Sequence, residues 1–206
     1  EGICDLILER GLDLNIWAYA RVDTVKQDML AKLRRAGFRW LAFGIEAANA
    51  KVRDDVQKGF DQDDIRTTLR QVWDAGIYVI GNYIFGLPED DRQTMQETLD
   101  LAMDLNCEFA NFYCAMAYPG TKLYDQVKAA GVELPKDWGA YGQYSANAQP
   151  LATKYVMSKE IVAFRDAAFR EYYENPVYLN MLEKTFGRDA RDFVGRILAH
   201  DLKRDG

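Results

Sequence analysis

Residues 77–89 read IYVIGNYIFGLPE, and this stretch decides the fold class. Its first nine residues form an almost unbroken run of apolar side chains, which is typical of a parallel strand covered on both faces. The run ends in the turn sequence Gly86-Leu87-Pro88-Glu89, and helical spacing follows from about Arg92 to Leu105. A buried strand, a turn and a helix in this order predict one βα unit.

The same rhythm occurs three more times in the first 131 residues. Apolar runs at 14–20, 38–45 and 109–117 are each followed by a segment with helical spacing. Consecutive βα units place their strands in parallel, either in an open sheet or in a barrel. The chain is therefore predicted to be an α/β protein with about four parallel βα units.

Individual residues predict where several helices begin. The spacing of Thr24 and Gln27 fits a capping box at the start of the first helix. Asn49 can cap a short helix that stops before Gly59, and Asp61 can start the next helix.

Beyond Gly131 the pattern changes. Residues 141–150 contain turn residues and aromatics without a period, which predicts a long loop that can cover the mouth of the fold. Helical spacing resumes at Ser158 and is broken at Asn175-Pro176 and at Gly187. We therefore expect βα units in 1–131, a loop or lid in 132–157 and a helical extension in 158–206.

The composition excludes several classes of partner. Among 206 residues the formal net charge is −6 with acidic and basic residues interleaved, so no nucleic-acid partner is expected. No apolar run reaches the roughly 20 residues that cross a bilayer. Three cysteines without a secretory signal favour reduced thiols and a cytoplasmic location. Because the chain opens at Glu1 in a stretch already amphipathic, we expect a fragment of a longer protein.

The strand ends hold the candidate binding residues, because ligands of parallel α/β folds bind at the carboxyl ends of strands. Glycines there let a flat ligand approach the main chain, and carboxylates accept hydrogen bonds from a ribose diol or an amino group. Arg21 can bind a carboxylate or instead pair with Glu46, and Glu89 can instead stabilise the next helix N-terminus. The plain alternative is that turn residues simply gather where strands meet water. The strand-end candidates are Arg21, Gly44, Glu46, Gly86, Glu89 and Tyr118.

Three segments together are more specific than any one candidate: 43–49 (FGIEAAN), 84–89 (IFGLPE) and 118–124 (YPGTKLY). In this order and spacing, the stretch from Leu14 to about Gly131 resembles the later strands of radical S-adenosylmethionine enzymes. The resemblance is closest to the group that often carries a cobalamin-binding domain upstream. It implies a partial (βα) barrel in which Glu46 holds polar groups of S-adenosylmethionine. It also implies that Ile84, Gly86, Glu89 and the backbone near Tyr118 lie beside the adenine.

The sequence departs from this family in one respect. The Cys-x3-Cys-x2-Cys loop that binds a 4Fe–4S cluster and the Gly-Gly-Glu that usually follows the next strand are absent. Cys107 and Cys114 have the wrong separation to replace them. We therefore expect no metal ligand and no catalytic residue in this chain, with the cluster, and a possible cobalamin, held by upstream parts of the parent protein.

The resemblance implies a parent enzyme that cleaves S-adenosylmethionine reductively and modifies a small organic substrate by radical chemistry. Methyl transfer, ring formation and rearrangement all stay open. One alternative is a non-catalytic module that forms homo-oligomers through an open barrel edge. Another is a non-radical (βα) barrel enzyme with Glu46 and Glu89 as acid and base, although the strand ends offer no histidine or lysine to assist them.

Overall fold

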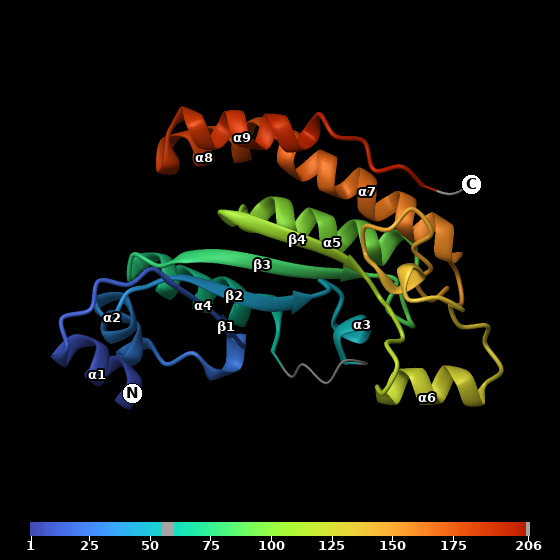
Figure 1. Ribbon diagram of the computed structural model, residues 1–206, viewed down its shortest axis with the longest axis horizontal. Coiled ribbons are helices and arrows are strands. Elements are labelled where there is room, and N and C mark those ends of the chain that lie inside the picture. Colours follow the sequence, from blue (N-terminus) through green and yellow to red (C-terminus); the bar gives the residue numbers. More distant parts are fainter. Residues whose placement is uncertain (55–59, 205–206) are drawn as a thin grey trace.

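The computed structural model of the chain describes residues 1–54 and 60–204, and it contains one parallel sheet (Figure 1). The sheet order is β1-β2-β3-β4, with all three strand pairs parallel. Helices connect successive strands, so the predicted α/β fold, a partial radical-SAM-type barrel, is confirmed. The strands are β1 (Ile16–Ala20), β2 (Phe38–Glu46), β3 (Tyr78–Phe85) and β4 (Phe109–Cys114), and the main connecting helices are α2 (Gln27–Arg35), α4 (Gln62–Asp74) and α5 (Arg92–Leu105).

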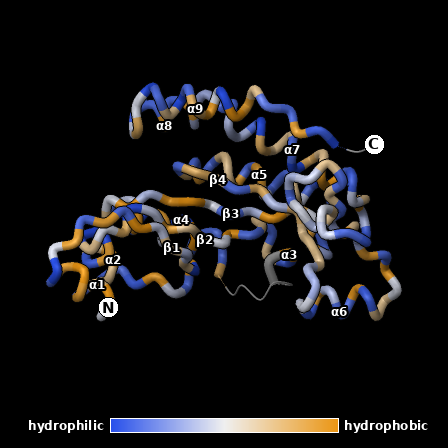
Figure 2. Tube along the Cα trace, in the orientation of Figure 1, coloured by the Kyte–Doolittle hydropathy of each residue, from blue (hydrophilic) through white to orange (hydrophobic). Residues whose placement is uncertain are grey.

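The two faces of the sheet differ because side chains alternate along each strand. On one face, Phe43 and Val79 are fully buried in the main core, together with helix residues such as Leu69 and Leu99. Figure 2 shows hydrophobic residues along much of β3. The opposite face, here called the inner face, is formed by the alternate residues of the four strands. In strand order these are Trp17, Tyr19, Trp40, Ala42, Gly44, Tyr78, Ile80, Asn82, Ile84, Phe109, Asn111 and Tyr113.

Three helices follow the sheet: α7 (Ser158–Glu174), α8 (Pro176–Phe186) and α9 (Arg188–Leu198). They confirm the predicted helical C-terminal part, and Figure 1 shows them beyond β4. The ring of Phe186 stacks on Trp40 at 5.6 Å between centroids and lies 4.8 Å from Tyr78. Helix α8 therefore covers the inner face where the strands begin, and it leaves the carboxyl half of that face to other contacts.

Most helix starts agree with the sequence. The backbone N–H of Lys51 donates to Asn49 at 3.1 Å, ahead of α3 (Ala50–Asp54). Asp61 and Asp64 form a reciprocal capping box on α4. The expected end of α3 before Gly59 lies outside the described residues.

The capping box predicted at Thr24 is wrong. Thr24 lies in a 3₁₀ turn, η1 (Val22–Thr24), and its hydroxyl donates to the carbonyl of Arg21 at 3.1 Å. That turn points the hydroxyl backward along the chain, so α2 begins at Gln27 after Lys26 without a side-chain cap.

The remaining elements lie at the two ends of the βα series. Helix α1 (Gly2–Glu9) packs Cys4 and Ile7 against Ala36. Helix α6 (Lys122–Ala129) and the 3₁₀ turn η2 (Gly139–Tyr141) follow β4. Within the described residues, no helix is both long and apolar enough to span a membrane.

Candidate cofactor site

The carboxyl ends of β2, β3 and β4 lie side by side. Gly44 is in register with Asn82, and Phe85 with Cys114. The three segments singled out by sequence therefore leave the sheet at one edge, with Glu46 at the end of β2 and Ile84 near the end of β3. At the end of β1, Ala20 pairs with Phe43, which brings the following residue, Arg21, to the same edge.

Glu46 has a strained backbone. Its φ of 66° is left-handed, and the β2–β3 register shifts between Gly44 and Glu46. A left-handed conformation costs a non-glycine residue about 1–2 kcal/mol. Such strain persists where the surrounding structure holds it, and it is concentrated at ligand sites. The half-buried side chain of Glu46 thus leaves β2 at a turn of defined shape.

A small apolar cluster lies beside this turn. Ala47, Val52, Leu87 and Ala115 are all buried together, and the partly buried side chain of Ile84 packs against them. These residues come from the ends of β2, β3 and β4 and from α3. They form an apolar floor at the carboxyl ends of the strands, which is the environment that a flat purine ring requires.

Gly86 makes room for a neighbouring helix. It has a φ of 79°, and a Cβ built on it would lie 2.7 Å from Cδ1 of Ile161 on α7. The missing side chain therefore lets α7 approach the end of β3. Packing of α7 therefore accounts for the missing side chain at Gly86, and approach of a ligand to its backbone at the rim stays a prediction.

Sequence reasoning missed Asp90, which holds this turn. Asp90 is 1% exposed, and its Oδ2 accepts the backbone N–H groups of Gly86 and Leu87, each at 3.0 Å. Its Oδ1 accepts the hydroxyl of Thr94 at 2.7 Å. Burial raises the pKa of Asp90, and these three hydrogen bonds oppose that rise. The signal was the spacing of Asp90 and Thr94 across the start of α5, where Asp91 is the N-cap.

Glu89 forms ion pairs. Its Oε2 lies 3.0 Å from Nζ of Lys51, and its Oε1 binds Lys154. Hydrogen bonds from Lys154 first and Lys51 second hold the pKa of Glu89 below its ordinary value. The alternative that Glu89 only stabilises a helix N-terminus is therefore wrong. A carboxyl group with a lowered pKa is also unsuited to donate protons near neutral pH.

Arg21 and Tyr118 both contact other protein groups. Arg21 donates from Nε and Nη2 to the two carboxylate oxygens of Asp23, at 3.0 and 2.8 Å, so its planar fork is already occupied. Its pairing partner in the structure is Asp23, so the predicted alternative of an Arg21–Glu46 pair is wrong. The carbonyl of Tyr118 accepts the hydroxyl of Thr121 at 2.7 Å, and its ring lies 6.2 Å from that of Tyr141.

The loop after α6 is pinned along the free edge of β4. Gln143 accepts the N–H of Cys114 at 2.8 Å and donates to its carbonyl at 2.9 Å. Arg165, which is 1% exposed, donates to the carbonyl of Gln143 at 2.6 Å and lies 5.1 Å from the ring of Tyr144. Sequence reasoning did not identify this buried arginine, because its partners are far away in the sequence.

The described residues do not fit a 4Fe–4S cluster. Within 1–54 and 60–204, no three histidine, cysteine or acidic side chains gather in a way that could hold a metal ion. Cys107 and Cys114 are buried near opposite ends of β4, and burial raises the pKa of their thiols to about 12 and about 11. Cluster ligands are thiolates, so these two thiols are unsuited to that role.

Comparison with known proteins agrees with this geometry. The family described as the Radical SAM superfamily matches residues 9–102. An uncharacterized methyltransferase of Pyrococcus horikoshii is 25% identical over 173 residues, covering 84% of this chain and 37% of the relative. The heme chaperone HemW of Bacillus subtilis is 22% identical over 191 residues, covering 92% of this chain and 50% of the relative. The chain thus spans half or less of these two relatives.

A solved structure supports the same fold. The cobalamin-dependent S-adenosylmethionine radical enzyme OxsB, with aqua-cobalamin and S-adenosylmethionine bound, superposes with a TM-score of 0.58. The match covers 95% of this chain and 36% of that chain at 15% identity, so it is a likeness of fold. Together with the family match and the strand-end motifs, it supports one conclusion: residues 9–102 of the chain belong to the radical SAM superfamily.

Proposed function

We propose that the strand-end rim binds S-adenosylmethionine and that the chain is part of a radical enzyme that modifies a small organic molecule. One observation carries the proposal. Glu46, in its left-handed turn, and Ile84, on its apolar floor, lie at the ends of neighbouring strands. An apolar surface beside a carboxylate matches a ligand that has an adenine ring next to a ribose diol and an amino group.

Each rim residue has a separate task in this proposal. Glu46 accepts hydrogen bonds from the polar groups of the cofactor, and Ile84 contacts the adenine ring. The turn at Gly86 and the backbone near Tyr118 border the ring, and Asp90 keeps the first of these in place. Glu89 and Arg21 act indirectly, since their ion pairs brace the rim. When bound, S-adenosylmethionine supplies a methyl group or, after reductive cleavage, a deoxyadenosyl radical.

The iron–sulfur cluster of such an enzyme needs ligands beyond the described residues, because the buried cysteines do not suit it. We therefore propose that this chain is inactive alone and that the parent protein supplies the cluster. The fold likeness to a cobalamin-dependent enzyme and the relationship to a methyltransferase support methyl transfer with cobalamin bound elsewhere in the parent.

We further propose three functional parts: 1–131 carry the rim, 132–157 cover it, and 158–206 close the sheet. The contacts of Gln143 and Lys154 at the rim support the second part, and the stacking of Phe186 supports the third. The rival acid–base enzyme is less well supported, because Glu89 is held ionised by two lysines.

The test is a calorimetric titration of S-adenosylmethionine into the chain without iron. We expect saturable binding to the wild type and loss of about tenfold in affinity in Glu46→Gln, which keeps the shape of the side chain but removes its charge. Glu171→Gln, the same change at an exposed position of α7, is the matched control, and its affinity should change less than threefold. Equal affinities of Glu46→Gln and the wild type would refute the role of Glu46, and absence of binding to the wild type would refute the proposed site.

A further inference from the structure

An amide pair lies on the inner face, next to the proposed cofactor rim. Asn82 of β3 and Asn111 of β4 are in register, and the side-chain amide of Asn111 donates to Oδ1 of Asn82 at 2.9 Å. The amide of Asn82 donates in turn to the main-chain carbonyl of Phe43 on β2, at 3.1 Å. Polar side chains at two adjacent positions of an otherwise apolar and aromatic face have no evident role in packing.

The hydrogen-bond chain fixes which way both amides point. The carbonyl of Phe43 can only accept, so Nδ2 of Asn82 must face it and Oδ1 of Asn82 must face Asn111. Asn111 therefore turns its Nδ2 toward Asn82 and its Oδ1 away. Among the described residues, no group donates to Oδ1 of Asn111. The pair thus presents an oriented acceptor on the partly buried side chain of Asn111, to which water or a ligand can donate.

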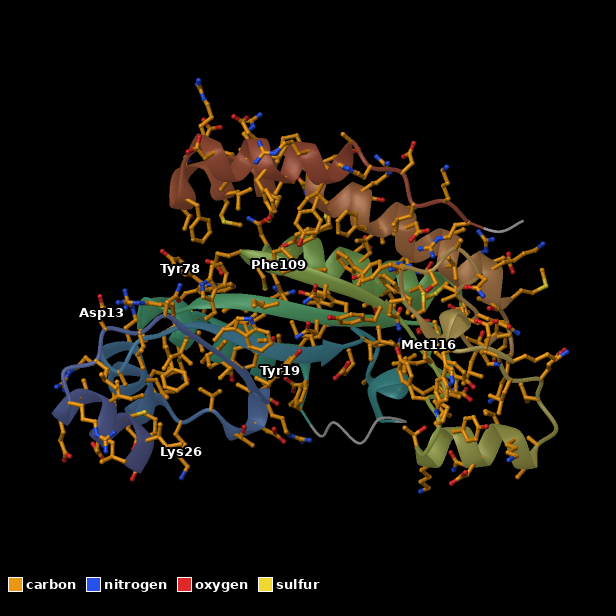
Figure 3. The ribbon with its side chains drawn as sticks, in the orientation of Figure 1. Asp13, Tyr19, Lys26, Tyr78, Phe109 and Met116 are labelled. Atoms are coloured by element: carbon orange, nitrogen blue, oxygen red, sulfur yellow. The ribbon has the colours of Figure 1, made fainter. Side chains whose placement is uncertain are left out.

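The surroundings of this acceptor suit a flat ring. Tyr113 is two residues beyond Asn111 on the same strand and face, and Tyr19 occupies the inner face of β1 with 73% of its surface exposed (Figure 3). The pKa of Tyr113 is raised mainly by burial. The nearby hydroxyls of Tyr144, Tyr19 and Tyr118 raise it further. Tyrosines from three parts of the chain thus gather close to Tyr113.

The strand between them carries small residues on this face. Ala42 and Gly44 are the inner-face residues of β2, between Tyr19 on β1 and Asn82 on β3. Neither has a side chain larger than a methyl group. The face therefore has aromatic rings at its two sides, small residues between them and one hydrogen-bond acceptor, an arrangement that favours planar, conjugated molecules.

We propose that this part of the inner face binds the organic substrate and that the substrate is a planar heteroaromatic molecule with a ring N–H, of the pyrrole or indole class. The ring N–H donates to Oδ1 of Asn111, and Tyr19 and Tyr113 contact the faces or edges of the ring. This inference deepens the proposed function and rests on it, because the bound molecule is a substrate only if the chain is part of a radical enzyme. The binding itself does not require S-adenosylmethionine.

The test uses indole as the probe and 1-methylindole, which lacks the N–H, as the matched control ligand. Side-chain amide signals of the ¹⁵N-labelled chain are followed by NMR during each titration. We expect indole to shift the signals of Asn82 and Asn111. The signal of Asn175, which caps α8 and contacts Met103, should stay unchanged. We expect 1-methylindole to bind about five- to tenfold more weakly, which corresponds to one lost hydrogen bond.

Two variants separate the acceptor from general packing. Asn111→Leu should weaken indole binding about five- to tenfold, while Asn111→Asp, which keeps an acceptor, should retain it. Gln93→Leu, the same kind of change on the exposed side of α5, should have no effect. If a variant fails to fold, the comparison of the two ligands on the wild type still decides.

Several results would overturn the proposal: equal binding of indole and 1-methylindole, unchanged signals of Asn82 and Asn111 at saturation, or full affinity in Asn111→Leu. Ligand-independent dimerisation that covers the two amides would assign the face to a second copy of the chain instead. A parallel titration of S-adenosylmethionine keeps the two ideas distinct. Indole binding without cofactor binding would refute the cofactor site alone, and the reverse would refute only this inference.

Discussion

The hydroxyl of Tyr173 on α7 bonds both main-chain groups of Ala110 on β4, accepting from its N–H at 3.0 Å and donating to its carbonyl at 2.8 Å. One side chain thus occupies a position where a further strand could pair. The same device recurs at the other end of β4, where Gln143 pairs with Cys114. An edge strand whose polar groups are satisfied by side chains is protected against pairing with another chain.

Removing this hydroxyl should destabilise the protein and expose the edge. Tyr173→Phe leaves a buried N–H and a buried carbonyl without partners, so we expect a loss of about 1–3 kcal/mol in the free energy of unfolding. Urea denaturation measures the loss, and size-exclusion chromatography should show added self-association. Tyr155→Phe, at a residue 62% exposed, is the control and should cost less than about 0.5 kcal/mol. Equal stability of the two variants would contradict the role of the hydroxyl.

A second prediction concerns the contact between Gly86 and Ile161. Gly86→Ala should cost about 2–4 kcal/mol, because a left-handed residue acquires a side chain and that side chain overlaps Ile161. Gly120 is the matched control, since its φ of 86° is similar but nothing lies within 4 Å of a Cβ built there. Gly120→Ala should therefore show only the backbone part, about 1 kcal/mol.

A double-mutant cycle isolates the steric part. In an Ile161→Ala background the cost of Gly86→Ala should fall to about that of Gly120→Ala, as measured by chemical denaturation. If Gly86→Ala costs the same in both backgrounds, the packing of α7 does not explain the glycine.

These contacts show where sequence reasoning succeeds and where it stops. The helix from Arg92 to Leu105 was predicted with the bounds that α5 has, because its periodicity and its turn residues are local signals. The packing of Ile161 on Gly86 joins residues far apart in the sequence, and so does the bond of Tyr173 to Ala110. No local pattern encodes such a contact, so the glycine motif was interpreted through ligand access alone.

The strand-end site was predictable only in outline. The motifs placed Glu46 and Ile84 at one rim, since parallel strands share their carboxyl edge. The partners of Arg21 and Glu89 were not predictable, because several opposite charges compete for each long side chain and the tertiary structure decides among them. Asp90 was missed because it follows Glu89 in an acidic run whose simplest interpretation is a solvated helix start.

A third prediction uses the opposite pKa shifts of Glu89 and Asp90. The folded-state pKa of Glu89 is lowered, so its ion pairs stabilise the protein above the ordinary carboxyl range and are lost as the pH falls through the lowered pKa. The folded-state pKa of Asp90 is raised. The stability that Asp90 gains from being protonated is therefore present below the ordinary aspartate pKa of about 3.9. It is lost as the pH rises through the raised pKa.

Thermal unfolding between pH 3 and pH 7 can separate the two carboxyl groups. The stability difference between wild type and Glu89→Gln should grow as the pH rises from about 3 to above 4.3, the ordinary glutamate value. The difference between wild type and Asp90→Asn should shrink over the pH range above about 3.9. Parallel pH profiles for the two variants would contradict the assigned environments.

The fourth prediction concerns the cysteines and iron. Cys4, Cys107 and Cys114 are all buried, and burial raises the pKa of the Cys107 thiol to about 12 and that of the Cys114 thiol to about 11. At pH 8 these two thiols are almost wholly protonated, so the native chain should react with iodoacetamide far more slowly than the same chain in urea. Anaerobic incubation with iron and sulfide should give no absorption band near roughly 400 nm and less than about 0.5 iron per chain, because three thiolates cannot gather. Mass spectrometry of the alkylated protein checks the first expectation, and a colorimetric iron assay checks the second. A stable cluster with about four irons per chain would mean that the cysteines leave their buried positions, and the division of tasks between this chain and the rest of its parent would then have to be abandoned.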